Sequence, residues 1–308
     1  MRPKLGGRFG LFGVALMVLA ISLTVPVSAA KSPVISSSTG GTKCFVVVPS
    51  GSLILSQSQT TIVVRFVNGS TVVYSSSPNR SATTRACTAT EGQAPTINGW
   101  IEDASNSVSS SYTYMTDQWP VPLAPSSGSG AYGGPLTYLF NGIQNSAPII
   151  YQPVLAYGCE TGNFLYCSMG GAYWWISAES CNTSCTSTTP IKVSVGDSIT
   201  GTVVSDSTYC SPNVAYDITI DDTTSGHSAT LKSCASAGYG ALGVPAALEA
   251  YNIGSCSNLP NEGGGMTFGS ISSTPTQSHA WTININTVSP SCSYGMSSSA
   301  GSVTLFFT

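Results

Sequence analysis

Short runs of β-branched and aromatic residues recur along the chain, and turn residues close each run. Thr60–Val67 and Ser70–Tyr74 flank Asn68-Gly69, and an Asn-Gly pair between two such runs is a strong hairpin signal. No segment has the capped, amphipathic pattern of a helix. Because strand signals at these intervals are typical of a sandwich, the sequence predicts an all-β protein, an antiparallel β-sandwich with long loops.

Further strand signals continue to the end of the chain. Two apolar strands around a turn near Asn145 are predicted within 136–158. The segment Pro122–Pro135 is rich in Gly, Ser and Pro, which predicts a surface loop. The other predicted strands are Tyr173–Ile176, Ile191–Val195, Ser198–Val204, Tyr216–Ile220, Ser228–Leu231, 266–272, 281–287 and Val303–Phe307.

Residues 1–30 have the pattern of a secretory signal peptide. A basic start ends at Arg8, an apolar run follows to about Leu23, and small residues up to Ala30 suit a cleavage site. The alternative is a retained membrane anchor, for which the apolar run is rather short. We therefore expect a secreted, extracellular protein with no stable membrane anchor after processing. The mature chain is predicted to comprise 31–94, an N-terminal β region or possible pro-region, and 95–308, the main sandwich domain.

All ten Cys follow the signal segment, and an even number in an exported chain favours disulfides. Spacing suggests the local pairs Cys159–Cys167 and Cys181–Cys185, whereas the other pairings stay open. A metal site is the alternative. However, the two His are remote in sequence from the Cys181 and Cys185 pair, and no second paired motif is present. We therefore expect disulfides and no bound metal.

Charged residues make up only 7% of the chain, and the net charge is −3. Binding of nucleic acid needs clustered Lys and Arg, so this composition argues against it. Acid unfolds many proteins because it protonates carboxylates that stabilise the folded state. A protein with few carboxylates should therefore lose little stability in acid. Tolerance of an acidic habitat is therefore one hypothesis, and ordinary variation in the surface of a secreted protein is the other.

Common hydrolase motifs are missing from the sequence. There is no G-x-S-x-G elbow for a Ser-His-Asp triad, and His227 lies in a predicted hairpin turn. The Asp-Thr-Gly or Asp-Ser-Gly pair of an aspartic protease is also missing. Asp221-Asp222 and Glu102-Asp103 are predicted to be solvated surface positions.

Two apolar runs each contain one polar side chain that can do chemistry. Gln152 lies in Ile149–Gly158, and Glu249 lies in Ala247–Ile253. A buried polar group in such a run needs a partner or serves a purpose. A carboxamide facing a carboxylate across a cleft would supply an oxyanion donor and a general base. Taken alone, each residue is more often structural.

The order of several short motifs resembles the glutamic peptidases, or eqolisins, over residues 95–287. An apolar pair before Gln152, an aromatic strand, a Val-x-Val-Gly-Asp-x-Ile segment and an apolar strand with Glu249 follow one another in the order that the family has. The matching segments are Asn98–Trp100, Trp119–Pro122, Leu139–Ile143, Ile149–Gln152, Tyr173–Ile176, Val193–Ile199, Thr223–Gly226, Leu248–Ile253 and Met266–Ile271.

The resemblance implies a secreted, acid-tolerant endopeptidase with a concanavalin-like sandwich of two packed antiparallel sheets. In it, Gln152 would stabilise the oxyanion, and Glu249 would serve as general base and acid on a water molecule. The resemblance also implies a polypeptide substrate and no metal or organic cofactor, and we expect a monomer. The expected substrate-binding residues are Trp100, Phe140, Trp174 and Trp175.

The chain departs from the family pattern at several positions. Leu139 or Phe140 stands where the family has an active-site Trp, and Gln144 stands where it has an Asp. These changes predict an altered substrate specificity. They also keep open a non-catalytic module on the same sandwich that binds carbohydrate or another protein through its Trp side chains. A third hypothesis, suggested by the Ser- and Thr-rich composition, is a structural component of the cell surface.

Overall fold

Buried and exposed side chains alternate along the strands of this protein. In β14 (Ser198–Asp206), Ile199, Gly201 and Val203 are buried, whereas Val204 is exposed. The computed structural model describes residues 44–307 except 58–60, 76–83, 87, 90–97, 129, 131–132, 146–148, 164–165, 183, 211–213, 236–239, 262, 264 and 289. The predicted signal segment therefore lies outside the described residues.

Two packed, mostly antiparallel sheets make up the described chain, which confirms the predicted sandwich. The first sheet has the order β19-β7-β17-β9-β10-β11-β12-β1-β6, with β13 beside β11. Its strands are β1 (Cys44–Val48), β6 (Thr88–Ala89), β7 (Asn98–Tyr112), β9 (Leu136–Gln144), β10 (Ile150–Asn163), β11 (Tyr166–Cys181), β12 (Ser184–Thr188), β13 (Ile191–Lys192), β17 (Gly240–Tyr251) and β19 (Thr282–Ile285).

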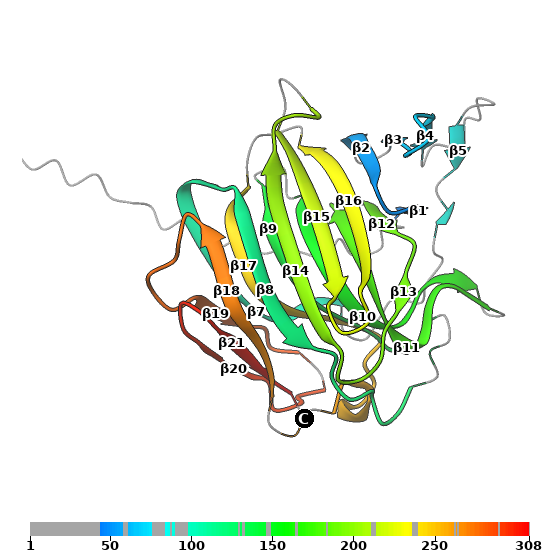
Figure 1. The fold of residues 1–308 in the computed structure, drawn as a ribbon. Coiled ribbons are helices and arrows are strands. Elements are labelled where there is room, and N and C mark those ends of the chain that lie inside the picture. Colours follow the sequence, from blue (N-terminus) through cyan, green and yellow to red (C-terminus); the bar gives the residue numbers. More distant parts are fainter. Residues whose placement is uncertain are drawn as a thin grey trace, which may run out of the picture. The chain divides into compact units, whose positions relative to one another are not determined.

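The second sheet has the order β20-β21-β18-β8-β14-β15-β16-β2-β3-β4-β5. Figure 1 shows β8, β14, β15 and β16 side by side in this layer. Besides β14, its strands are β2 (Ser52–Gln57), β3 (Thr61–Arg65), β4 (Thr71–Ser75), β5 (Thr84–Ala86), β8 (Tyr114–Pro120), β15 (Val214–Asp222), β16 (His227–Ala235), β18 (Met266–Thr274), β20 (Gly295–Ser298) and β21 (Val303–Phe306). A short 3-10 helix covers Cys256–Asn258.

The N-terminal strands extend both sheets. β1 pairs in parallel with β12, and β2 pairs in parallel with β16, while β2, β3 and β4 form antiparallel hairpins. The compact unit that contains the described residues covers Ser37–Thr308. The division at residue 94 and the pro-region remain predictions.

The main core lies between the two sheets. Tyr151 of β10 stacks on Tyr216 of β15 with ring centroids 4.5 Å apart, and Trp119 packs against Phe268 at 4.8 Å. The Tyr216 hydroxyl donates to the backbone oxygen of Tyr112, which fixes the two layers at this point. These contacts place the odd-numbered residues of the first half of β10 in the core.

A buried polar group also joins the layers. The amide of Asn141 on β9 donates to the backbone oxygen of Gly201 on β14 at 3.1 Å. Burial raises the pKa of the nearby Asp117 carboxyl well above its usual range, although a hydrogen bond from Asn141 lowers it. A β-carbon on residue 201 would lie 2.4 Å from Oδ1 of Asn141, so this approach needs glycine.

Three sequence expectations are wrong in detail. Asp222 was expected in a solvated turn, but it is the last residue of β15 and only 1% exposed, because its carboxylate accepts hydrogen bonds from Thr224 and Ser225 of the turn that covers it. Glu102 and Asp103 were expected at the surface, but they are 0% and 7% exposed because β7 lies between β17 and β19 in the first sheet. The predicted strand Ile191–Val195 ends at Lys192. The chain then leaves the sheet for a turn in which Gly196 donates its N–H to the backbone oxygen of Val121.

Four disulfides join described cysteines: Cys159–Cys167, Cys181–Cys185, Cys210–Cys234 and Cys256–Cys292. The two local pairs suggested by sequence spacing are confirmed. Disulfides persist in oxidising compartments, so this set is consistent with an extracellular protein.

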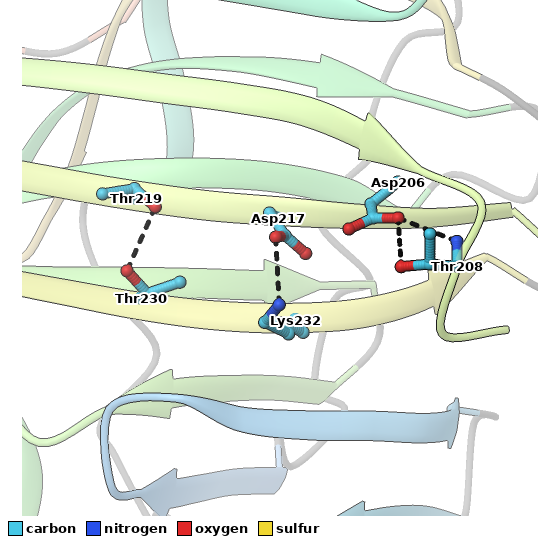
Figure 2. A network of polar contacts seen from close by, with 6 residues as sticks. All are labelled: Asp206, Thr208, Asp217, Thr219, Thr230 and Lys232. Atoms are coloured by element: carbon cyan, nitrogen blue, oxygen red, sulfur yellow. Dashed lines mark hydrogen bonds and ion pairs between the residues drawn. The ribbon is translucent and has the colours of Figure 1, made fainter.

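Paired polar side chains cover the outward-facing surface of the second sheet. Figure 2 shows Thr219 of β15 opposite Thr230 of β16, with their hydroxyls 3.1 Å apart, and Lys232 bonded to Asp217 at 3.2 Å. Asp206 accepts hydrogen bonds from Thr208 in the same view. Such cross-strand pairs stabilise a sheet.

Candidate functional site

Strand alternation places Gln152 on the face of the first sheet that points away from the second sheet. Tyr151 and Leu155 of β10 pack in the core between the sheets, so Gln152, Val154 and Ala156 point the opposite way. We call this surface the outer face of the first sheet. Side chains there are still buried, and Gln152 is only 4% exposed.

Glu249 lies on the same outer face. It pairs across the sheet with Tyr138 of β9, and Tyr138 pairs with Ala156 of β10. Gln152 and Glu249 are therefore diagonal to each other. Strand β9 lies between their strands, and their cross-strand rows are about 13 Å apart along β10. The structure thus brings the two predicted catalytic residues to one face, with no direct hydrogen bond between them.

Glu179 of β11 lies directly opposite Gln152. Nε2 of Gln152 donates to Oε2 of Glu179 at 3.3 Å, and Oγ of Ser177 donates to Oε1 at 2.6 Å. Burial raises the pKa of the Glu179 carboxyl, hydrogen bonds from Ser177, Ser187 and Gln152 lower it, and the charge of Glu249 raises it further.

The contact with Glu179 fixes the direction of the Gln152 amide. One N–H of the primary amide is bound to Glu179, while the second reaches only the Cys181 sulfur at 3.9 Å, and a disulfide sulfur is a weak acceptor. Oε1 of Gln152 has no partner. The amide therefore has a donor and an acceptor available for a ligand.

Tyr251 holds Glu249 in a similar way. The Tyr251 hydroxyl donates a hydrogen bond to Oε1 of Glu249, from two residues further along β17. Glu249 is only partly buried, unlike Glu179, which is 1% exposed. Because one oxygen is fixed and the side chain reaches the surface, Glu249 is the more accessible carboxylate of the two for a water molecule.

Three of the four predicted substrate-binding aromatics belong to the outer face. Phe140 and Trp175 are fully buried there, and Trp100 contacts Phe140 edge-on with centroids 5.5 Å apart. Trp174 points the other way, into the core, where it packs on Tyr157. The structure therefore does not bring Trp174 to the site.

The position where the family has an Asp is also on the outer face. Gln144, at the end of β9, is 4% exposed, and its Oε1 has no partner. Gln144 is thus a second buried carboxamide on the same face as Gln152. It is a neutral amide at the position where the family pattern has a carboxyl group.

Three residues of this face were not predicted as site residues, namely Glu179, Tyr138 and Tyr251. Glu179 had been noted only because Trp174, Trp175 and Glu179 approximate the aromatic strand of the glutamic peptidases. The signal for Glu179 was the alternation Trp175-x-Ser177-x-Glu179 along one strand, which puts these residues on one side. Tyr251 could have been found by the same alternation from Glu249.

Another cluster resembles a hydrolase triad in composition only. Ser225 donates to Asp222 and contacts Nδ1 of His227 at 2.9 Å in the β15–β16 turn. In a triad the His lies between the Ser and the Asp, whereas here the Ser lies between the other two.

In the part of the chain that the structure describes, no group of three or more His, Cys, Asp or Glu is arranged to hold a metal ion. Within the same ranges, no helix has the length and hydropathy required to cross a membrane.

Comparisons with known proteins found similarity to solved peptidase structures. A scytalido-glutamic peptidase with a peptide-based transition-state analogue is 17% identical, with a TM-score of 0.44, over 68% of this chain and 98% of that one. SCP-B, an eqolisin in complex with the tripeptide Ala-Ile-His, is 16% identical, with a TM-score of 0.43, over 68% of this chain and 98% of its own. No family model and no curated protein match the sequence.

Proposed function

We propose that this protein is a secreted, acid-active endopeptidase of the glutamic type, with Gln152 and Glu249 as its catalytic residues. The observation that carries the proposal is that both side chains lie on the outer face of the first sheet, each bonded to its own partner, Glu179 or Tyr251. Positioned donors and bases are what hydrolysis of an amide needs.

In the proposed reaction, Glu249 takes a proton from a water molecule as the water oxygen bonds to the peptide carbonyl carbon. The carbonyl π electrons move to its oxygen, and the N–H of Gln152 that otherwise faces the Cys181 sulfur donates to that oxyanion. When the carbonyl re-forms, the carbon–nitrogen bond breaks and the protonated Glu249 gives its proton to the leaving amine. The products are a carboxylic acid and an amine, and the carboxylate of Glu249 is restored.

Several buried carboxyl groups support activity in acid. Burial raises the pKa of Glu179, of Asp117 and of Glu102. These groups are neutral in acid, where their burial carries no charge penalty. The disulfides support secretion, and the reaction requires no metal or organic cofactor.

The purified mature protein should cleave a denatured protein substrate in acid, between about pH 2 and pH 7, with activity falling toward neutrality. A metal chelator should leave the rate unchanged, because both catalytic groups are side chains. The measurement is the appearance of new amino termini with time. A correctly folded wild type that releases none at any pH would overturn the peptidase proposal and favour a binding module on the same sandwich.

Gln152→Ala should lower kcat about 10²- to 10³-fold, because it removes the side-chain donor to the oxyanion. KM should change less than kcat, since the interaction strengthens as the oxyanion forms. Gln118→Ala is the matched control. Gln118 is an exposed carboxamide on the second sheet that bonds to Ser198, so this variant should keep wild-type rates. Equal rates for the Gln152 variant and the control would remove Gln152 from the mechanism.

A further inference from the structure

Two buried carboxamide oxygens on the outer face of the first sheet have no hydrogen-bond partner among the described residues. They are Oε1 of Gln152 on β10 and Oε1 of Gln144 on β9, and each residue is 4% exposed. A buried acceptor without a donor costs free energy, so each one in a folded protein calls for an explanation. Two of them on adjacent strands indicate a donor that the described part of the chain does not supply.

The strand register places the two carboxamides next to each other. Gln144 pairs directly with Ile150, which lies two residues before Gln152 on the same face of β10. The two glutamines are therefore diagonal neighbours across one pair of strands. The β-carbons of diagonal neighbours lie roughly 7–8 Å apart, within reach of long side chains. Both side chains can thus contact the same ligand group.

Gly142 lies beside both amides. The register places it opposite Gln152 on β10, and on β9 it comes two residues before Gln144. On its other side Gly142 pairs with Val244 of β17, which is fully buried. Because glycine has no side chain, β9 contributes none at the point between Gln152 and Val244. A ligand group over Gly142 would therefore lie beside both carboxamides.

The side chains that flank Gln144 are apolar. Gln144 pairs with Ile150 on one side and with Leu242 on the other. Ile150 in turn pairs with Cys181, which is held in a disulfide. Ile150 and Cys181 are buried, and Leu242 is partly buried. A ligand for this site should therefore combine a hydrogen-bond donor with an apolar stem.

The charge of the site favours a neutral donor. A cation such as a lysine ammonium would need a countercharge in these apolar surroundings. Glu179, the carboxyl group opposite Gln152, already accepts hydrogen bonds from Gln152 and Ser177. Burial raises the pKa of Glu179 above 4.5, so this group is mostly neutral in more acidic solution. The site then offers two neutral acceptors and no negative charge.

A primary carboxamide is the neutral group that matches two acceptors. Its nitrogen carries two N–H donors, whereas a backbone amide carries one. Two oxygens that accept from one such nitrogen lie about 5 Å apart, because each hydrogen bond is about 2.9 Å long. Diagonal glutamines can present their oxygens at this separation. In proteins and peptides, only the side chains of Gln and Asn carry this group.

We propose that Gln144 and Gln152 form a subsite for the side-chain carboxamide of a Gln or Asn in the substrate, with Gln144 as its specificity-determining residue. This inference rests on the proposed peptidase function. One N–H of the substrate carboxamide donates to Oε1 of Gln144 and the other to Oε1 of Gln152, while the aliphatic stem packs on Ile150 and Leu242. The bond that is cut lies close to this side chain in the substrate sequence, because Gln152 also contacts the reacting carbonyl.

The test uses peptides of one sequence in which a single Gln, or a Met in its place, is moved along the chain. Met has nearly the shape of Gln but leaves both oxygens without a donor. At one position near the cut bond, the Gln peptide should have a kcat/KM about 25-fold above that of the Met peptide, since each hydrogen bond contributes about 5-fold. In Gln144→Met this ratio should fall to about 5-fold or less, while the rate on the Met peptide is kept.

Gln118→Met is the matched control. Gln118 is an exposed carboxamide on the second sheet that bonds to Ser198, so its loss should leave the ratio unchanged. The thermal midpoint of unfolding of Gln144→Met should equal or exceed that of the wild type, because the change removes a buried acceptor that has no partner. A purely structural role for Gln144 would instead lower the midpoint and slow the cleavage of both peptides alike.

Binding of the same peptides, measured by calorimetry, separates the two proposals. If the wild type cuts the Gln and Met peptides equally fast at every position, water meets the two oxygens and the subsite is wrong, while the peptidase function stands. If the folded wild type cuts nothing but binds a Gln peptide more tightly than its Met counterpart, and Gln144→Met loses this preference, the peptidase function is wrong and the subsite stands. Absence of both cleavage and preferential binding would overturn both.

Discussion

Glu249→Gln should reduce peptide hydrolysis by about 10⁴-fold or more, to the background rate, because it removes the group that serves as both base and acid. The amide oxygen of the new side chain can still accept the hydrogen bond from Tyr251, so the fold and the position of the side chain should be kept. The measurement is kcat/KM on a defined peptide at the acid optimum, with the unfolding transition of each variant recorded alongside.

Glu179→Gln is the sharpest control for that experiment, since it makes the same chemical change to the other carboxyl group beside Gln152. Its amide oxygen can still accept from Gln152, so we expect a loss of about 10-fold or less, near the value of one hydrogen bond. The reverse result, an inactive Glu179 variant and an active Glu249 variant, would identify Glu179 as the base and would make the assignment of Glu249 wrong.

Much of the fold could be predicted because its signals are local. The Asn68-Gly69 turn, the alternation in Ser198–Val204 and the apolar runs on either side of Asn145 each specify a strand or hairpin within a few residues. The parallel pairing of β1 with β12 and of β2 with β16 could not be predicted, because such long-range contacts leave no pattern in either segment.

The same distinction applies to the disulfides and the site. Cys159–Cys167 and Cys181–Cys185 close short loops and were suggested by spacing, whereas Cys210–Cys234 and Cys256–Cys292 join residues 24 and 36 positions apart, whose proximity depends on the tertiary fold. Consecutive residues of a strand point to opposite faces, so one of Trp174 and Trp175 had to lie in the core. Sequence alone could not decide which one. The pairing of Gln152 with Glu179 needed the register of β10 against β11.

The second large effect expected is a loss of stability as the pH rises, caused by Glu102. Its carboxyl is fully buried, and neither oxygen has a hydrogen-bond partner of normal geometry. Burial raises the pKa of Glu102 from 4.5 to about 8, although the nearby backbone N–H of Gly295 lowers it somewhat. Tyr294, which lies close by, has its own pKa raised to about 12, by burial and then by the charge of Glu102.

The sign of the effect follows from the protons bound in each state. Between pH 4.5 and about pH 8, folded Glu102 keeps its proton while the unfolded chain has lost it. The free energy of unfolding is therefore greatest below the unfolded pKa and declines as the pH rises through this window. The loss approaches about 5 kcal/mol above the folded pKa, because each tenfold change in the acid dissociation constant corresponds to about 1.4 kcal/mol.

Urea unfolding of the wild type and of Glu102→Gln from about pH 3 to about pH 9 measures this loss directly. Gln resembles the protonated carboxyl and cannot ionise, so the two stability curves should run together in acid and separate above pH 4.5. Asp206→Asn is a control of opposite sign. Hydrogen bonds from Thr208 lower the pKa of Asp206, so its contribution is lost as the pH falls. Parallel curves for the wild type and the Glu102 variant across the range would show that Glu102 does not set the alkaline limit. Stability curves that separate only above pH 4.5 would show that ionisation of the buried Glu102 destabilises the folded protein, which is therefore most stable in acid.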